Sequence, residues 1–406
     1  MTLLARPHAV LVFLVFAFAY FFSAVLRAIT ATLSPTLTRE FDLSAQQLGL
    51  LAGGYFLGFA AIQLPLGSWL DRHGPRKVVI GFMLAAVAGC LAFSAADGFS
   101  GLLVARVLCG VGVSACLMAP LTGYRRWLAP PAQLRANSWM LMTGSLGMVA
   151  STLPVQWLVP QVGWRPVFWL LALGIGVAIA AIALLVPHWR GGLPAHAHDA
   201  EPPGYAQVWR HAYFRRMAPV GFFNYGGMIA IQSLWAGPWL VRVAGYAPLD
   251  AARGLFLINV CMLCTFWSWG LVNPWLQRKG FSTDKLIARG VPLSLLVLTA
   301  IVVAGPQAGA GAWALFCVSS TFVSLAQPAV GMAFPAALAG RALSAYNLVI
   351  FAGVFVVQWS IGLLVDAFAA AGWDPVASFR AAMAAFLVAC LFGWAYFILA
   401  RDNQRQ

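Results

Sequence analysis

Charged residues are scarce in this chain of 406 residues: Asp, Glu, Lys and Arg make up 9% of it, and only 11 residues are acidic. An ordinary soluble domain is about 25% charged and about 45–50% apolar. This chain is instead 62% hydrophobic, with a mean hydropathy of +0.83. The scarcity of charge excludes a soluble enzyme, a disordered tail and a nucleic-acid-binding module, and it leaves long apolar runs as the main feature of the sequence.

Twelve apolar runs are each long enough to cross a bilayer as a helix. A spanning helix needs roughly 20 apolar residues, because the hydrocarbon core is about 30 Å thick. The runs are also too long and continuous for the strands of a membrane barrel, which alternate over about 10 residues. The sequence therefore predicts an all-α membrane protein with twelve transmembrane helices, over residues 8–33, 46–70, 77–96, 100–124, 134–159, 165–187, 214–241, 251–276, 284–305, 310–336, 342–368 and 377–400.

Basic residues are distributed unequally over the predicted loops. Of the 25 Lys and Arg residues, 18 lie on one side of the helices and 5 on the other, and only Arg27 and Arg106 lie well inside. Cytoplasmic loops carry the excess of Lys and Arg, so we expect both termini in the cytoplasm. The same bias explains the formal net charge of +14 without a nucleic-acid partner. The excess of arginine over lysine indicates a GC-rich bacterial genome, and hence a bacterial inner membrane.

No cluster of residues suggests catalysis or metal binding. The pair Cys261 and Cys264 has the spacing of a redox or zinc motif, but it lies in an apolar run with no histidine or second pair nearby. We interpret these cysteines as small buried apolar side chains. His196 and His198 lie in a polar segment and are interpreted as solvated. The sequence therefore predicts no enzyme, no cofactor and no metal site.

The longest polar segment, residues 188–212, divides the chain into two parts of six predicted helices each, residues 1–187 and 213–406. An internal repeat supports this division. The sequence WLDRHG at residues 69–74 returns as WLQRKG at residues 275–280, 206 positions later. Two pseudo-symmetric six-helix halves form a known plan of membrane transporters, with the binding site near the membrane midplane between the halves.

Three segments resemble signatures of the major facilitator superfamily. The loop GSWLDRHGPRK at residues 67–77 resembles the loop signature of that superfamily, and Leu102, Arg106, Gly110 and Gly112 match a second signature. Residues 163–169, GWRPVFW, resemble the entry to the sixth helix in many members. The resemblance covers the whole chain. It implies a secondary transporter that carries a small molecule across the bilayer by alternating access. The oligomeric state does not follow from the sequence, and a monomer is the working expectation.

The loop signature predicts a conformational latch. Gly67 would let another helix approach closely, and Asp71 would face basic loop residues or a helix N-terminus. A contact of this kind can form in one conformation and break in the other; the alternative is a solvated ion pair that contributes about 0–1 kcal/mol. Gln277 replaces the aspartate in the second copy, which predicts a weaker latch there. The predicted latch residues are Gly67, Asp71, Arg72, Gly74, Arg76 and Arg106.

Arg27 is the strongest candidate for a functional residue. A central intramembrane arginine costs roughly 2.5–3.5 kcal/mol on insertion scales, and such charges usually face a cavity or a partner. Tyr20, Ser23 and Thr30 share its helix face. No carboxylate lies in the middle of an apolar run, so the expected partner is an external carboxylate or phosphate held by the planar guanidinium. The alternative is an arginine that reaches the interface or bonds backbone carbonyls.

The segment from Arg27 to Pro35 also resembles the first helix of the anion:cation symporter branch. The resemblance implies that Arg27 binds the carboxylate of an organic anion. Leu26 and Val113 stand where that branch usually has carboxylates for coupling protons, which favours a uniporter or an exchanger. For Arg106, the superfamily resemblance implies a structural role through hydrogen bonds to neighbouring helices.

The sequence thus predicts a transporter of a small organic anion. Further polar or aromatic residues mark a candidate cavity, and the predicted substrate-binding set is Arg27, Tyr20, Ser23, Tyr55, Asn224, Tyr225, Gln232, Asn347 and Gln358. For each of them, a hydrogen bond between helices is an equally good explanation. Two alternatives stay open. Proton-driven efflux of drugs or amphiphiles is opposed by residues 143–154, which lack the Gly-Pro-x-x-Gly-Gly of that branch. A transporter-like sensor would bind its ligand without moving it.

Overall fold

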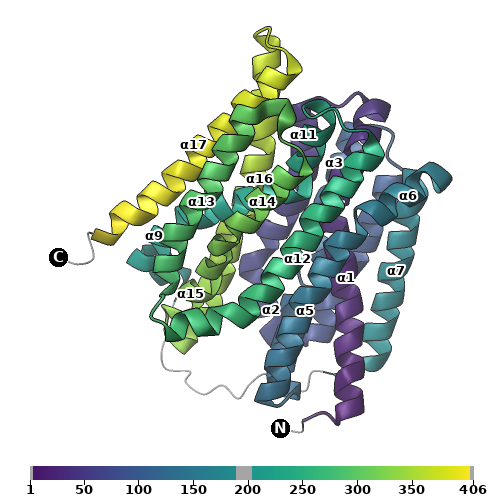
Figure 1. Cartoon of the computed structure of the whole chain (residues 1–406). Helices are drawn as coiled ribbons and strands as arrows, with labels where there is room; N and C mark the ends of the chain where they lie inside the picture. The colour runs from purple at the N-terminus through teal and green to yellow at the C-terminus, as the bar shows by residue number, and fades with distance from the viewer. Residues whose placement is uncertain (1–2, 189–203, 403–406) are drawn as a thin grey trace.

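The computed structural model describes residues 3–188 and 204–402; residues 1–2, 189–203 and 403–406 lie outside it (Figure 1). The described part is almost entirely helical and contains no strand, so the predicted all-α membrane fold is confirmed. Residues 3–188 are called the first half below and residues 204–402 the second half.

The first half contains seven helices: α1 (Arg6–Phe41), α2 (Ala45–Ser94), α3 (Phe99–Val113), α4 (Met118–Trp127), α5 (Pro130–Ala150), α6 (Leu153–Val162) and α7 (Trp164–Leu185). The second half begins with α8 (Tyr205–Arg210), α9 (Ala212–Pro219), η1 (Val220–Tyr225), α10 (Gly226–Ala230), η2 (Ile231–Trp235) and α11 (Ala236–Arg242). It continues with α12 (Pro248–Arg278), α13 (Thr283–Ala304), η3 (Gly305–Gln307), α14 (Ala310–Ser320), η4 (Thr321–Leu325), α15 (Ala326–Met332), α16 (Ala336–Ala370) and α17 (Pro375–Asp402).

Ten stretches of helix in the described residues are long and apolar enough to cross a membrane. The other two predicted spans, 134–159 and 214–241, are helical but interrupted. The first is broken between α5 and α6, where Pro154 lies in the first turn of the new helix and the hydroxyl of Thr32 donates to the Ser151 carbonyl over 2.8 Å. The second contains the π-helical segments η1 and η2.

The sequence repeat coincides with a repeat of backbone conformation. Gly74 has φ +78° and turns the chain between the two spans of α2, and Gly280 has φ +80° in the turn between α12 and α13. An L-residue with a side chain rarely adopts such a φ, so glycine is required at both positions. The same turn is therefore built twice, 206 residues apart.

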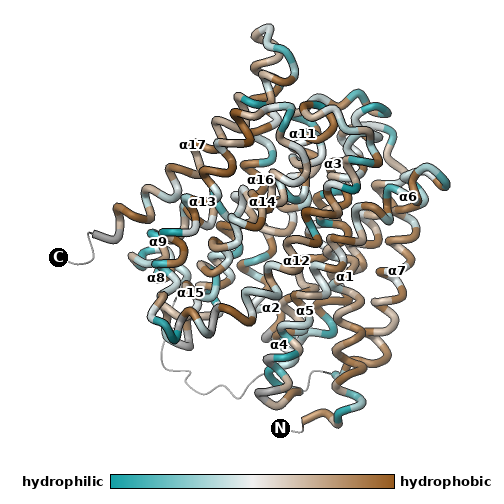
Figure 2. The backbone as a smooth tube through the Cα atoms, in the orientation of Figure 1, coloured by the Kyte–Doolittle hydropathy of each residue, from teal (hydrophilic) through white to brown (hydrophobic). Residues whose placement is uncertain are grey.

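The helices run side by side between two ends of the bundle (Figure 1). One end, called the N-terminal end below, holds the start of α1. The other, called the far end, holds the end of α1, the start of α2 and the end of α16. Apolar residues predominate along α7 (Figure 2), and several of them, such as Leu173 and Leu184, are exposed, as expected where side chains face lipid rather than water.

The interpretation of the cysteine pair as buried is wrong for Cys264, which is exposed, while Cys261 is half-buried. The reason is the outward face of α12, on which Trp267 and Leu271 are also exposed, at 66% and 61%. The other five cysteines are buried. Most of the predicted central loop, including His196 and His198, lies outside the described residues.

Candidate functional site

Arg27 lies in the middle of α1, where the two halves of the chain meet. Its guanidinium carbon is 6.0 Å from the ring centre of Phe59 on α2 and 6.0 Å from that of Phe351 on α16. The phenols of Tyr20 and Tyr55 lie close enough to interact with its charge. Aromatic faces attract a cation, by about 0.5–2 kcal/mol. This aromatic surround, called the Arg27 site below, explains how an arginine is tolerated at this depth.

The rings leave part of the guanidinium unsatisfied. The Nε atom of Arg27 is buried and has no hydrogen-bond partner in the described part of the chain. A ring face attracts positive charge but supplies no lone pair of the kind that a carboxylate or carbonyl offers. Because most buried polar atoms in native proteins are hydrogen-bonded, an unsatisfied one requires an explanation, such as a ligand or ion.

The predicted residues of α1 and α2 come together around this site. The hydroxyl of Tyr55 donates to the backbone carbonyl of Ser23 over 3.1 Å, and the Ser23 hydroxyl is buried without a partner among the described residues. Tyr20 packs on α5, where a Cβ at Gly144 would lie 2.6 Å from its ring. Tyr225 of η1 also interacts with the charge of Arg27. Arg27, Tyr20, Ser23, Tyr55 and Tyr225 therefore form one cluster.

The two π-helical segments carry the remaining candidates of this stretch. Single π-turns inside α-helices occur frequently at functional sites. Asn224 in η1 donates to the Cys390 carbonyl over 3.1 Å, and its own Oδ1 is buried without a partner in the described chain. Gln232 in η2 donates to Asn259 over 3.0 Å. Both amides are thus engaged within the second half.

The face of α16 that carries Asn347, Phe351 and Gln358 makes two kinds of contact. At its ends, Asn347 accepts a hydrogen bond from Gln327 over 2.6 Å, and Gln358 donates to Ser233 over 3.0 Å. Between them, Phe351 lies 4.5 Å from Phe59, measured between ring centres. The amides therefore bond within the second half, while the aromatic middle faces α2 and Arg27. No bond in the described residues joins Asn224, Gln232, Asn347 or Gln358 to Arg27, and their contact with a substrate stays a prediction.

Arg106 on α3 is completely buried, and one of its three nitrogens is hydrogen-bonded, while Nε and Nη2 have no partner among the described residues. Its Nη1 donates to the Leu26 carbonyl of α1 over 2.8 Å, and its guanidinium carbon lies 5.1 Å from the ring centre of Tyr55. A hydrogen bond from a charged donor contributes about 1.5–3 kcal/mol. Arg106 therefore links α1, α2 and α3 directly behind the Arg27 site, with Tyr55 between the two arginines.

The far end of the bundle is closed by direct contact of α2 with α16. The carboxylate of Asp366 accepts hydrogen bonds from the backbone N–H of Ala45 over 3.1 Å and of Gln46 over 2.7 Å. A Cβ at Gly49 would lie 2.4 Å from the Gln358 carbonyl oxygen, so the two backbones touch there. Sequence analysis missed Asp366. Its one signal was an acidic residue at the end of an apolar run.

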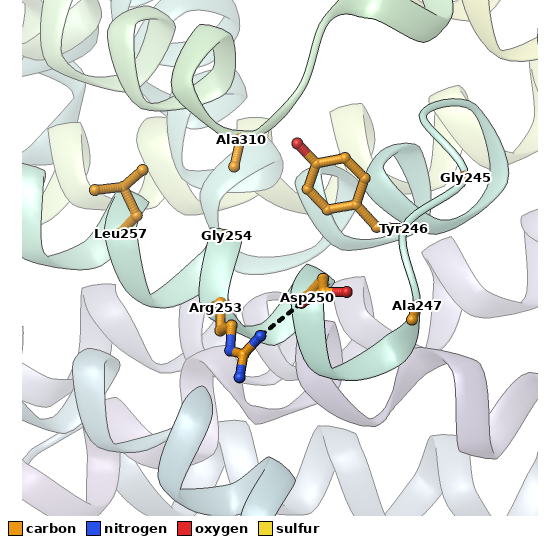
Figure 3. A pocket seen from close by; sticks show the side chains of 8 residues that line it. All are labelled: Gly245, Tyr246, Ala247, Asp250, Arg253, Gly254, Leu257 and Ala310. Carbon is orange, nitrogen blue, oxygen red and sulfur yellow. Dashed lines mark hydrogen bonds and ion pairs between the residues drawn. The ribbon is translucent and has the colours of Figure 1, made fainter.

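A separate hollow of about 530 Å³ opens beside the loop that joins α11 to α12 (Figure 3). Tyr246 and Ala310 line it, and its charged residues, Asp250 and Arg253, pair with each other over 2.8 Å. Because these charges neutralise each other, the hollow is a weaker candidate for an ionic ligand than the Arg27 site.

The family of the chain follows from its sequence as a whole. A family profile described as Major Facilitator Superfamily matches residues 16–358. The chain belongs to the Major Facilitator Superfamily. It is accordingly a multi-pass membrane transporter and not an enzyme, as the sequence predicts.

Individual relatives differ in what their names say they carry. The chain is 26% identical over 249 residues to a probable sulfoacetate transporter of Cupriavidus necator, covering 56% of each chain. It is 25% identical over 177 residues to quinidine resistance protein 1 of Saccharomyces cerevisiae, covering 42% of this chain and 30% of that one. The aligned part thus spans about half, or less, of these relatives' length.

Solved structures agree on the fold. A bacterial homolog of the human lysosomal transporter Spinster, in an inward-facing and unoccupied conformation, superposes with a TM-score of 0.79. The alignment covers 98% of this chain and 97% of that one at 18% sequence identity. At this identity the likeness shows the fold alone, and it confirms the superfamily fold of the described helices.

The superfamily loop between the two spans of α2 is held within the first half. Arg76 donates from Nη1 to the Val186 carbonyl over 3.2 Å and from Nη2 to the Ala183 carbonyl, so it caps the C-terminus of α7. The expectation that Gly67 permits a close helix contact is wrong for this conformation, because nothing lies within 4 Å of a Cβ placed there. The side chains of Asp71 and Gln277 lie outside the described atoms, so the predicted latch stays untested.

Proposed function

We propose that this protein is a secondary transporter that moves a small organic anion across the bacterial inner membrane by alternating access. The buried and unpartnered Nε of Arg27 is the observation that carries the proposal. In this scheme the anionic group of the substrate accepts hydrogen bonds from the guanidinium fork. Tyr20, Tyr55 and Tyr225 surround that group, and the rings of Phe59 and Phe351 cover its apolar body.

The location of the site fits the mechanism. Arg27 and Phe59 belong to the first half, and Phe351 belongs to the second. A ligand between them therefore contacts both halves, as expected of a transporter whose halves move against each other around a central site. We keep the division into residues 1–187, 188–212 and 213–406, the cytoplasmic position of both termini, and a monomer as parts of the proposal.

The other arginine supports this assignment by contrast. Arg106 donates from Nη1 to the Leu26 carbonyl and so joins α3 to α1, while its Nε and Nη2 are buried without a partner among the described residues. Arg27 differs in its position, because its guanidinium lies between Phe59 of the first half and Phe351 of the second half, whereas the contacts of Arg106 are all within the first half. One relative is named a probable sulfoacetate transporter, and sulfoacetate is an anion with a sulfonate and a carboxylate group. This name supports an anionic substrate.

A second candidate function is efflux of an aromatic amphiphile. The aromatic rings around Arg27 favour it, as does the name of the quinidine resistance relative. It is opposed by the positive charge of Arg27 among those rings, because this charge repels a cationic drug. A sensor that binds without transport would show the same binding but no flux into vesicles.

The test is ligand binding by thermal unfolding of the purified protein in detergent. Sulfoacetate and small carboxylates are compared with quinidine and chloramphenicol, on the wild type, Arg27→Ala, Arg27→Lys and a control, Arg253→Ala. A ligand at about 100 times its Kd stabilises the native state by roughly 2.7 kcal/mol. We expect stabilisation by an anion that is lost in Arg27→Ala, partly kept in Arg27→Lys, which lacks the planar fork, and unchanged in Arg253→Ala.

The proposal fails if cationic or neutral amphiphiles stabilise the wild type and Arg27→Ala equally, because Arg27 would then be structural. Counterflow of the stabilising anion into vesicles separates a transporter from a sensor. An anion that binds through Arg27 but never crosses the membrane would exclude transport.

A further inference from the structure

A second binding site is indicated on the outer surface of α2, at the N-terminal end of the bundle. A groove of about 520 Å³ runs along the hairpin of α2 and is lined by Trp69, His73, Lys77, Val78, Gly81, Phe82, Ala85 and Val111. Neither Arg27 nor any of the predicted latch residues lines it, although the latch residue Arg72 lies at its edge.

The groove has a basic mouth and an apolar floor. Arg72, His73 and Lys77 are all exposed around the Gly74 turn. None of the ion pairs found in the described side chains involves them, and Asp71 is the one acidic residue nearby in sequence. Beyond the mouth, the lining residues from Val78 onward are apolar. Charge thus gathers at one end of an otherwise apolar channel.

The length of the apolar part fits one leaflet of a bilayer. Lys77 to Ala85 covers eight helical steps, which at about 1.5 Å per residue is roughly 12 Å, and half of a hydrocarbon core is about 15 Å. A Cβ at Gly81 would meet nothing within 4 Å, so the groove is open along its floor. Trp69 packs on Phe82 with ring centres 5.7 Å apart and forms one wall at the interface level.

We propose that this groove binds an anionic phospholipid, with the phosphate at Lys77 and His73 and an acyl chain along Gly81. The charge complementarity selects an anionic lipid over a zwitterionic one, because juxtamembrane basic residues attract anionic lipid by about 1 kcal/mol each. The acyl channel selects a lipid over a free phosphate. A lipid seated here touches both spans of α2 and so stabilises the hairpin that carries the superfamily loop.

The repeated turn in the second half provides a matched control. Lys279 lies at the position equivalent to His73, 206 residues later, and its Nζ lies 4.2 Å from the ring centre of Trp275. This lysine is therefore already engaged with its own tryptophan. Its removal takes the same charge from the same end of the bundle without touching the groove.

The experiment measures lipid retention by native mass spectrometry of the full chain in detergent. Phosphatidylglycerol is compared with phosphatidylcholine of identical acyl chains, on the wild type, Lys77→Gln, Gly81→Leu and Lys279→Gln. We expect the wild type to prefer phosphatidylglycerol severalfold. Lys77→Gln should bind it roughly fivefold more weakly, which corresponds to the loss of about 1 kcal/mol per basic residue. Gly81→Leu should lose it by filling the groove at unchanged charge, and Lys279→Gln should match the wild type.

Four results would overturn the proposal. One is that the wild type retains the two lipids equally, and another is that both groove variants retain phosphatidylglycerol as the wild type does. A third is that Lys279→Gln loses as much lipid as Lys77→Gln, and the last is that glycerol phosphate without acyl chains competes fully with the lipid. The last would assign the basic mouth to a soluble phosphate. Since Gly81 is exposed with open space around its Cα, Gly81→Leu should fold, and its thermal unfolding serves as the check.

Discussion

The bond between Asp366 and the start of α2 makes a quantitative prediction about the conformational equilibrium. Each carboxylate oxygen of Asp366 accepts one backbone N–H of the other half, over 3.1 and 2.7 Å. Asp366→Asn replaces one of these oxygens by an NH2 group, which places a donor opposite a donor. One hydrogen bond to a charged acceptor is lost, which is worth about 1.5–3 kcal/mol.

If the bond exists only while the far end is closed, this loss lowers the ratio of closed to open molecules by roughly 10- to 150-fold. The assay is the distance between spin labels at Ser100→Cys and Ala370→Cys, which are exposed positions at the far end in different halves. Cys261 and Cys264 are first changed to Ser, because they are not fully buried and would react with the label. The other five native cysteines are buried and are kept. We expect a longer distance to appear or grow in Asp366→Asn.

Asp374→Asn is the matched control. Asp374 also accepts two backbone N–H bonds at a helix N-terminus, over 2.9 and 3.0 Å, but both come from α17 in its own half. It should leave the distance between the labels unchanged. The reasoning is refuted if Asp366→Asn leaves the distance distribution as in the wild type, or if Asp374→Asn alters it to the same extent.

Three further outcomes follow from single contacts. Gly49→Ala should open the far end in the same spin-label assay, because its Cβ would lie 2.4 Å from a carbonyl oxygen of α16, whereas Gly67→Ala, with open space around it, should not. Arg106→Ala should lower thermal stability in detergent by at least the 1.5–3 kcal/mol of its bond to the Leu26 carbonyl; unchanged unfolding would exclude a structural role. Tyr205→Phe removes the 3.0 Å hydrogen bond from the Tyr205 hydroxyl to the Leu64 carbonyl of α2 and should lower thermal stability by about 1 kcal/mol. Burial raises the pKa of this phenol more than the nearby charge of Arg341 lowers it, so the hydroxyl stays protonated and remains a donor.

The helices and the central arginine could be predicted because each follows from a local rule. Runs of about 20 apolar residues predict spanning helices whatever their partners are, and a charge such as Arg27 is costly at that depth in any fold. The glycine turns at Gly74 and Gly280 were visible as a repeat. These features depend on the chain's own neighbours in sequence.

The partners of Arg27 and Asp366 could not be predicted in this way. Phe59 and Phe351 meet only because α2 packs on α16, and the sequence gives no periodicity for a contact between halves. Asp366 binds backbone N–H groups, which every residue except proline carries, so its partner leaves no trace in the sequence. Asn224 and Gln232 could be chosen from the sequence as polar residues in an apolar run, but the π-turns that carry them depend on how the helix packs.

The two ends of the bundle differ in whether their contacts join the two halves. At the far end, Asp366 and Gly49 join one half to the other. At the N-terminal end, Arg76 is bonded to α7 of its own half and Gly67 touches nothing. A transporter that opens alternately to the two sides needs contacts that exchange in this manner. When the far end opens, water can hydrate a half-buried carboxylate at a helix end. The hydrogen bonds of Asp366 can therefore break without leaving a buried, unpaired charge. Arg27 lies between the two ends, so an anion bound there contacts both halves and can favour whichever arrangement encloses it.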